Sequence, residues 1–159
     1  MLVCSLKTQS PQPVPDDGRY HVLRFPFGTS ESLDEHRMHQ AAQPDGCQVT
    51  DWRADDRSGL IWPIAPGWGF LSAMIQWEPG GYVELRDRFT RDPLGLYGPP
   101  DSTATDHRPP SRGMQSFTKV WQMKVHPSTP LGLLVAHDDD VPRRVTLAEF
   151  KLVIHTEGA

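Results

Sequence analysis

The chain has 159 residues, a formal net charge of −4 at pH 7 and 37% hydrophobic side chains. This length fits one globular domain with a sizeable core. The charge gives no basic footprint for nucleic acid, no apolar run reaches the roughly 18 residues of a membrane span, and two cysteines are too few for a disulfide scaffold. We therefore expect no nucleic-acid partner and no membrane partner.

The first 18 residues predict an arm rather than part of the core. They end in the proline-rich, polar run SPQPVPDDG, which is typical of an extended tail that lies on a neighbouring molecule. They also lack the apolar segment and the small-residue cleavage site of a secretory signal. We predict an extended N-terminal arm over 1–18, a single β-rich domain over 19–159, and synthesis in the cytoplasm without a signal peptide.

One short helix is predicted near residues 32–42. Ser32 and Glu35 have the spacing of a capping box, and Asp34 stands in the first turn, where the helix dipole favours an anion. The run Pro44-Asp45-Gly46 ends this segment. The rest of the chain contains no comparable helical pattern.

Alternating apolar and polar side chains predict the strands. The predicted strands are residues 20–27, 70–77, 82–89, 117–126, 131–136 and 145–156. Trp77, Val83 and Trp121 then point to the core, and Asp87 is an inward-pointing exception. The last strand requires a bulge near Glu149 or burial on both faces. This order of elements predicts an antiparallel β-sandwich or jelly-roll-like barrel, mainly β, with one short helix.

A long loop is predicted at residues 92–113, between two of the strands. It has more than 20 residues, five of them proline. Loops of this length are usually functional or held in place by a partner. This loop and the N-terminal arm are therefore the expected surfaces for binding other proteins.

Two groups of histidines have partial metal-ligand character. His36 and His39 are three residues apart on the predicted helix, beside two carboxylates. His126, His137 and His155 stand at strand ends, and three aspartates follow the second of them. Neither group offers a complete ligand set at a defined spacing, so polar surface is the favoured interpretation. We predict no metal and no cofactor.

Motifs for catalysis are missing from the sequence, which predicts a protein that is not an enzyme. There is no Gly-x-Ser-x-Gly elbow and no phosphate loop. Residues 78–88 resemble the start of the first cupin motif, in which a Pro-Gly turn precedes a strand that carries His-x-His. Arg86 and Arg88 stand at those histidine positions, and arginine stays protonated and does not ligate a metal. The resemblance implies a jelly roll and, as an alternative function, a cupin-like enzyme with a degenerate metal site.

Aromatic side chains indicate a further alternative, a carbohydrate-binding module. Trp62 and Trp68 lie in the proline- and glycine-rich segment 60–69, and Tyr97 lies in the long loop. Exposed aromatic rings present an apolar face on which a sugar ring stacks. These three residues form the candidate binding surface for a glycan, and burial in the core is the competing interpretation.

Two segments resemble small virion structural proteins of actinobacterial phages. They are residues 55–94, which begin DDRSGLIWPIAPGWGF, and residues 126–155, which begin HPSTPLGLLVAHDDD. The resemblance implies a non-enzymatic minor tail or capsid-decoration protein located in the virion. Its partners would be other virion proteins and copies of itself in a homo-oligomer. No functional residue is carried over, because the group offers no catalytic motif to match.

Overall fold

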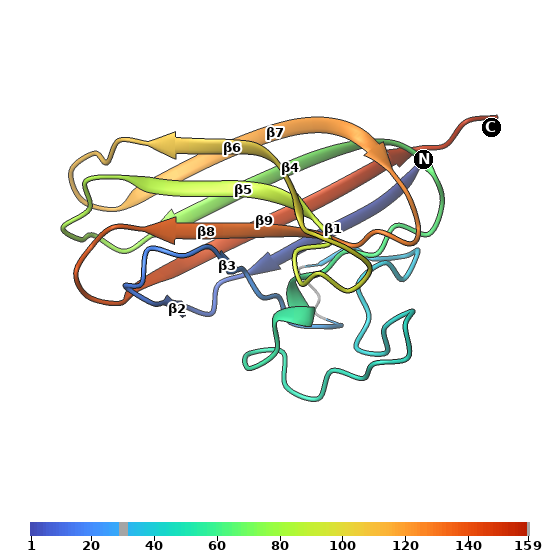
Figure 1. Cartoon of the computed structure of the whole chain (residues 1–159), viewed down its shortest axis with the longest axis horizontal. Helices are drawn as coiled ribbons and strands as arrows, with labels where there is room; N and C mark the ends of the chain where they lie inside the picture. Colours follow the sequence, from blue (N-terminus) through green and yellow to red (C-terminus); the bar gives the residue numbers. More distant parts are fainter. Residues whose placement is uncertain (29–31, 159) are drawn as a thin grey trace.

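Two antiparallel β-sheets pack face to face in the computed structural model, which describes residues 1–28 and 32–158 (Figure 1). The elements in chain order are β1 (Leu2–Thr8), β2 (Gln12–Val14), β3 (His21–Val22), the 3-10 helix η1 (Asp56–Gly59), β4 (Gly67–Trp77), β5 (Leu85–Arg91), β6 (Asp101–Arg108), β7 (Gln115–Val125), β8 (Leu131–His137) and β9 (Arg143–His155). The first sheet has the order β1-β9-β4-β7, and β2 also pairs with β9. The second sheet has the order β3-β8-β5-β6. The predicted antiparallel β-sandwich is confirmed.

Side chains of alternate residues fill the space between the sheets. Burial alternates along the whole of β4, because successive side chains of a strand point to opposite faces. The ring of Phe150 on β9 stacks on the ring of Phe89 on β5, with 5.8 Å between the centroids. Burying a large apolar side chain of this kind stabilises a fold by roughly 1.5–3 kcal/mol. Contacts of this type hold the two sheets together.

Five of the predicted strands lie within a few residues of their observed bounds; these are β4, β5, β7, β8 and β9. The sixth, expected over residues 20–27, is reduced to β3. The predicted bulge is present on β9 at Thr146, because Gln76 pairs with Leu147 whereas Trp77 pairs with Val145. It lies just before Glu149, where the sequence pattern placed it.

The prediction of an N-terminal arm is wrong. Residues 2–8 form β1, which pairs with β9 along its whole length, and Cys4 and Leu6 are fully buried. The proline-rich run begins only after this strand, and its own short strand, β2, joins the same sheet. Pro13 is tolerated in β2 because an edge strand leaves one side of its backbone unpaired. The first residues are therefore part of the sandwich.

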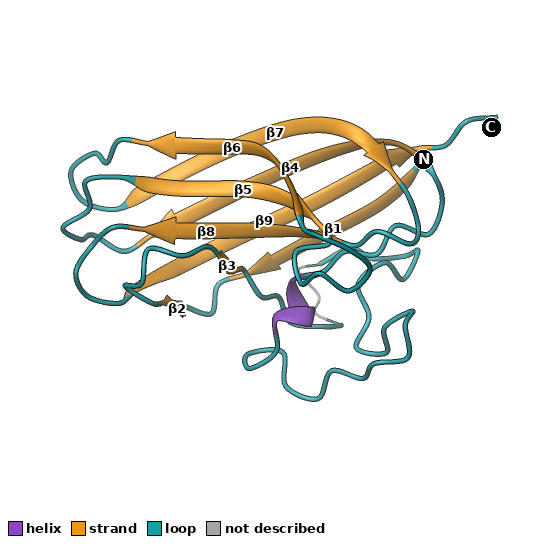
Figure 2. Cartoon of the chain, in the orientation of Figure 1, coloured by secondary structure: helices purple, strands orange, loops and turns teal. Residues whose placement is uncertain are grey.

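The predicted helix near residues 32–42 is also wrong, as Figure 2 shows. The Asp34 carboxylate accepts hydrogen bonds from the backbone N–H groups of Met38 at 2.7 Å and His39 at 2.8 Å. A short polar side chain that bonds nearby backbone groups competes with helical hydrogen bonds. The backbone of Leu33 bonds to Ser5 of β1 instead. Across residues 1–28 and 32–158, no helix is long and apolar enough to cross a membrane.

The predicted loop at residues 92–113 is interrupted by β6, which pairs with β5. Its sequence, DSTATDHR, is polar except for Ala104, so the alternation that reveals a strand is missing. The pairing shifts between Asp87 and Phe89, and the opposing Ala104 has a φ of +50°. This is a β-bulge in an edge strand. The polar segment is therefore an edge strand between two shorter loops.

Two of the predicted core positions are wrong. Val83 is 78% exposed, because it lies in the turn that precedes β5 rather than in the strand. Trp121 is 46% exposed, because β7 is the edge strand of its sheet. Trp77 and Asp87, by contrast, are buried as predicted.

Candidate functional site

The outer face of the first sheet carries a group of exposed apolar side chains. The residues between the core positions of β4 point away from the second sheet. Two of them are large aromatics: Trp68 is 47% exposed and Phe70 is 40% exposed. On the neighbouring strand β7, Val120 is 77% exposed. The indole Nε1 of Trp68 donates a hydrogen bond to Gln122 Oε1 at 3.0 Å.

Strand register brings these side chains together. Phe70 lies between Gln122 of β7 and Val153 of β9, and Ser72 lies opposite Val120. Because Ser72 is small, the surface sinks to a hollow of about 660 Å³. The residues that line it are Phe70, Leu71, Ser72, Val120, Trp121, Gln122 and Val153. We call the apolar side chains on this outer face the apolar face: Trp68, Phe70, Val120 and the half-buried Val153. Trp121 pairs with the core residue Leu71, so its side chain points to the other side of the sheet.

Charged side chains of both signs surround the apolar face. Lys124 Nζ is 3.1 Å from Glu157 Oε1, and Lys151 Nζ is 3.5 Å from Glu149 Oε1. An apolar centre with a polar rim is the usual anatomy of a protein–protein interface. The charged rim therefore fits a surface that another protein covers.

The chemistry of the hollow favours contact over catalysis. Its lining includes two polar side chains, Ser72 and Gln122, and no ionisable one. General acid–base chemistry needs a group that exchanges a proton near neutral pH. Single exposed apolar residues are common on proteins, whereas contiguous apolar patches mark interaction sites. This face therefore offers exposed apolar area rather than reactive groups.

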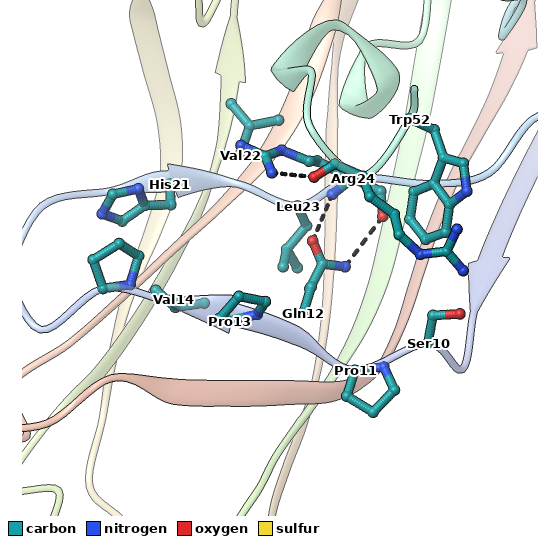
Figure 3. Close-up of a pocket in the computed structure, with 12 residues that line it drawn as sticks. Ser10, Pro11, Gln12, Pro13, Val14, His21, Val22, Leu23, Arg24 and Trp52 are labelled. Atoms are coloured by element: carbon teal, nitrogen blue, oxygen red, sulfur yellow. Dashed lines mark hydrogen bonds between the residues drawn. The ribbon is translucent and has the colours of Figure 1, made fainter. Parts of the chain in front are cut away.

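A second hollow, of about 320 Å³, lies between β2 and β3 at the edge where the sheets separate (Figure 3). The Gln12 side chain accepts a hydrogen bond from the backbone N–H of Arg24 at 2.9 Å and donates one to its carbonyl at 3.1 Å. The guanidinium of Arg24 bonds to Asp56, and that of Arg53 lies 4.6 Å from the ring centre of Trp52. These polar groups bond to one another, so their role is to hold β2 against the segment that follows β3.

The three residues predicted to bind a glycan do not share one surface. Trp62 is 3% exposed, and its Nε1 donates to Gln43 Oε1 at 2.7 Å. Tyr97 is 60% exposed and packs edge-on against Trp62, with 6.3 Å between ring centroids. Trp68 belongs to the apolar face on β4. Burial is therefore the correct interpretation for Trp62, and glycan binding by Trp68 or Tyr97 stays a prediction.

The histidines with metal-ligand character lie in different surroundings. His39 and His137 are buried, and each bonds a backbone carbonyl oxygen, at 2.7 Å and 3.0 Å. His36 is half-buried, and His126 and His155 are exposed. Within the described parts of the chain, no three His, Cys, Asp or Glu side chains are grouped to hold a metal ion.

The aspartates of the turn before β9 brace the turn before β5. Asp139 accepts hydrogen bonds from the backbone N–H of Gly81 at 2.8 Å and from Arg143 Nε at 2.5 Å. Asp138 accepts one from the backbone N–H of Val83 at 2.9 Å. The hydrogen bond from Arg143 lowers the pKa of Asp139 to about 2. These carboxylates are occupied by structural contacts.

The two arginines at the cupin histidine positions also have structural contacts. Arg86 Nε donates a hydrogen bond to Glu84, its neighbour on the same strand face. The guanidinium carbon of Arg88 lies 3.5 Å from the ring centre of Tyr20. A cation over an aromatic face is attracted by the ring quadrupole. Arg88 therefore holds the outer face of the second sheet to the segment before β3, whereas the contact of Arg86 is local.

Comparison with known proteins shows the fold and nothing finer. No family model matches the chain, and no curated protein matches it. Among solved structures it is similar to Eiger TNF from S. frugiperda, with a TM-score of 0.62 and 9% identity over 99% of this chain and 94% of that one. It is also similar to the globular domain of zebrafish complement 1qA protein, with a TM-score of 0.59 and 11% identity over 98% of both chains. The predicted jelly-roll architecture is confirmed.

Sequence analysis missed Phe70, Val120 and Val153 as functional candidates. All three are large apolar residues at strand positions that alternation assigns to the solvent side. A large apolar residue at a position expected to face solvent is the sequence signal that could have identified them. Only the pairing of β4 with β7 and β9 shows that the three positions are adjacent.

Proposed function

We propose that this chain is a non-enzymatic assembly protein that associates with copies of itself through the apolar face. The observation that carries the proposal is the exposure of Phe70 and Val120, at 40% and 77%, around one hollow on the outer face. Covering apolar surface stabilises an assembly by about 25 cal/mol for each Å² removed from water. A second copy offers the same apolar centre and a rim with charges of both signs.

The sheet is large enough for a stable interface. β4 and β7 each have 11 residues. A strand of that length spans about 35 Å, and four strands about 4.8 Å apart give a face of about 650 Å². A standard interface takes about 800 Å² from each partner. The sheet face together with its rim supplies an area of this order.

We further propose that this assembly belongs to a phage virion, as a minor tail or capsid-decoration component. The support is the resemblance of residues 55–94 and 126–155 to such proteins. A compact sandwich with a self-associating face is compatible with that setting, in which other virion proteins are the further partners. The measurement that checks the setting is the protein content of purified particles.

Two matched variants test self-association. Val120→Lys places a charge in the apolar face, whereas Val83→Lys changes a valine of equal exposure (78% against 77%) outside it. Burying an unpaired ammonium is strongly unfavourable, so Val120→Lys is expected to dissociate the oligomer while Val83→Lys leaves it intact. Sedimentation velocity over a range of protein concentrations measures the effect.

The same experiment contains the outcomes that contradict the proposal. A wild-type protein that stays monomeric at high concentration removes self-association altogether. If both valine variants still form the oligomer, the interface lies outside the apolar face and the proposal is wrong. Circular dichroism of each variant checks that the fold is unchanged.

A further inference from the structure

A buried charged cluster connects the two sheets at their open edge. Lys119 Nζ, from β7 of the first sheet, lies 2.7 Å from Asp87 Oδ1 of β5 and 2.9 Å from Asp106 Oδ2 of β6. The side chains of Lys119 and Asp87 are 3% and 4% exposed. Since β6 and β7 are the last strands of different sheets, backbone pairing does not join them. The cluster therefore bridges this edge of the sandwich through side chains.

The bulge on β6 and an aromatic ring complete the surroundings of the lysine. The carbonyl oxygen of Ala104 accepts a hydrogen bond from Lys119 Nζ. The φ of +50° at Ala104 is unfavourable for a residue with a Cβ atom. The ring centre of Phe89 is 4.9 Å from the same nitrogen. The backbone thus stores strain in a conformation that aims a carbonyl at Lys119.

Arg108 holds the Asp87 carboxyl group from the other side. Its Nε donates to Asp87 Oδ2 at 2.6 Å, and its Nη2 lies 3.3 Å from Asp87 Oδ1. This guanidinium places positive charge where negative charge develops if a nucleophile attacks Asp87 Cγ. The Asp106 side chain, 45% exposed, connects the cluster to water.

We propose that Lys119 and Asp87 condense to an intramolecular amide bond that covalently joins the two sheets. In this step Nζ bonds to Cγ and the Cγ–Oδ1 bond breaks. Nζ gives up two of its three protons, and both leave with Oδ1 as one water molecule. The step is not a redox reaction and needs no co-reactant. It goes beyond the proposed assembly function, because it concerns a covalent modification inside one chain.

The geometry gives each residue of the cluster a role in this step. Asp106 accepts a proton from the ammonium and passes it to the departing oxygen, while Arg108 stabilises the oxyanion. Groups held at contact distance in one molecule react as if at about 10⁵–10⁸ M. That advantage offsets the unfavourable free energy of forming an amide in water.

The bond would give the sandwich a covalent connection that its cysteines do not provide. Cys4 and Cys47 are both free thiols. An amide between β7 and β5 closes the edge at which the two sheets are otherwise held by side chains alone. A link of this kind resists heat and mechanical load, because separating the sheets there then requires breaking a covalent bond.

Peptide mapping of the purified full-length protein tests the proposal directly. Trypsin cleaves after Arg86, Arg88, Arg112 and Lys124, but not after a lysine whose Nζ is acylated. We expect residues 113–124 as one peptide, joined to residues 87–88 and lighter than the sum of the two by one water. A free peptide of residues 113–119 in full yield would falsify the proposal. A bond from residues 113–124 to residues 92–112 would assign the link to Asp106 and overturn it as stated.

Matched variants separate the reaction from simple dehydration. Cyclisation at Asp17-Gly18 or Asp45-Gly46 also removes one water, so whole-protein mass alone does not decide. Lys119→Arg keeps the charge without a nucleophilic amine, and Asp106→Asn removes the proton relay; both are expected to abolish the branched peptide. Lys124→Arg alters an exposed lysine of the same strand and is expected to retain it. A branched peptide that persists in Asp106→Asn contradicts the role given to Asp106.

Discussion

His39 lies inside the segment that connects β3 to β4, with 3% of its surface exposed. Its Nε2 is 2.7 Å from the carbonyl oxygen of Ser58, and its ring stacks on Phe27 with 4.4 Å between centroids. Burial lowers the pKa of His39 below the ordinary 6.5, because the charged imidazolium loses hydration there. The hydrogen bond to Ser58 and the nearby carboxylate of Asp34 oppose this only in part.

This lowered pKa predicts a loss of stability in acid. The unfolded chain binds a proton at His39 at a higher pH than the folded protein does. The stability that neutral His39 contributes to the folded state is therefore complete above pH 6.5, and it is lost as the pH falls toward the lower pKa of the folded state. The free energy of unfolding should fall by up to about 1.4 kcal/mol for each pH unit in that window.

Urea unfolding of wild type and His39→Gln between pH 7.5 and pH 5, at half-unit steps, measures this slope. The glutamine amide still donates a hydrogen bond to Ser58 but does not titrate, so the variant should show a flatter dependence. His36→Gln removes an imidazole from the same segment and should keep the wild-type slope. Equal slopes for wild type and His39→Gln would show that His39 does not carry the pH dependence.

The burial of a residue was predictable from strand alternation, whereas the partners that surround it were not. Asp87 was an inward exception on a well-patterned strand, and the structure supplies its partners from β6 and β7. Those partners, Arg108 and Lys119, stand 21 and 32 residues away, so no local pattern points to them. Val83 was misplaced for a similar reason, because Asp138, 55 residues away, binds its backbone in an exposed turn.

Among the elements, the strands with alternation were predictable and the polar ones were not. β4 and β9 each bury every second side chain over most of their length, which is the pattern that reveals a strand. β6 is polar except for Ala104, and β1, whose burial alternates, is followed closely by a proline-rich run. Pairing with a neighbouring strand makes both of them strands. The partner of β1 lies at the other end of the chain, and the polar sequence of β6 hides its pairing with β5.

Two substitutions in the segment 32–42 test whether it forms the observed loop or a helix with a capping box. In the loop, Asp34 takes the backbone N–H groups of Met38 and His39, whereas Glu35 is exposed. Asp34→Ala should therefore cost about 1–3 kcal/mol of stability, because buried donors lose their acceptor. Glu35→Ala should change stability by less than about 0.5 kcal/mol, as is usual for an exposed site. Chemical denaturation measures both. Comparable losses for the two variants would favour the capping box.

At the scale of the whole molecule, the N-terminal and C-terminal strands pair with each other in the first sheet. β1 and β9 lie side by side, and β9 also pairs with β4, so the first sheet needs the start, middle and end of the chain (Figure 1). The sequence predicted strands and a sandwich but not this order, because strand order depends on contacts between distant segments. The same order assembles the apolar face from β4, β7 and β9, which explains why the face was missed.

The virion setting makes a prediction about the molecule in its assembly. If the chain is a virion component, purified phage particles should contain it, and Trp68 and Phe70 should be covered there. Both rings are nearly half exposed in the single chain, at 47% and 40%. Hydroxyl-radical footprinting should therefore label them strongly in the dissociated Val120→Lys protein and several-fold less in particles. Tyr97, 60% exposed and outside the apolar face, serves as the internal reference. Particles that lack the chain would exclude the virion setting, and equal labelling in both samples would show that the apolar face stays uncovered.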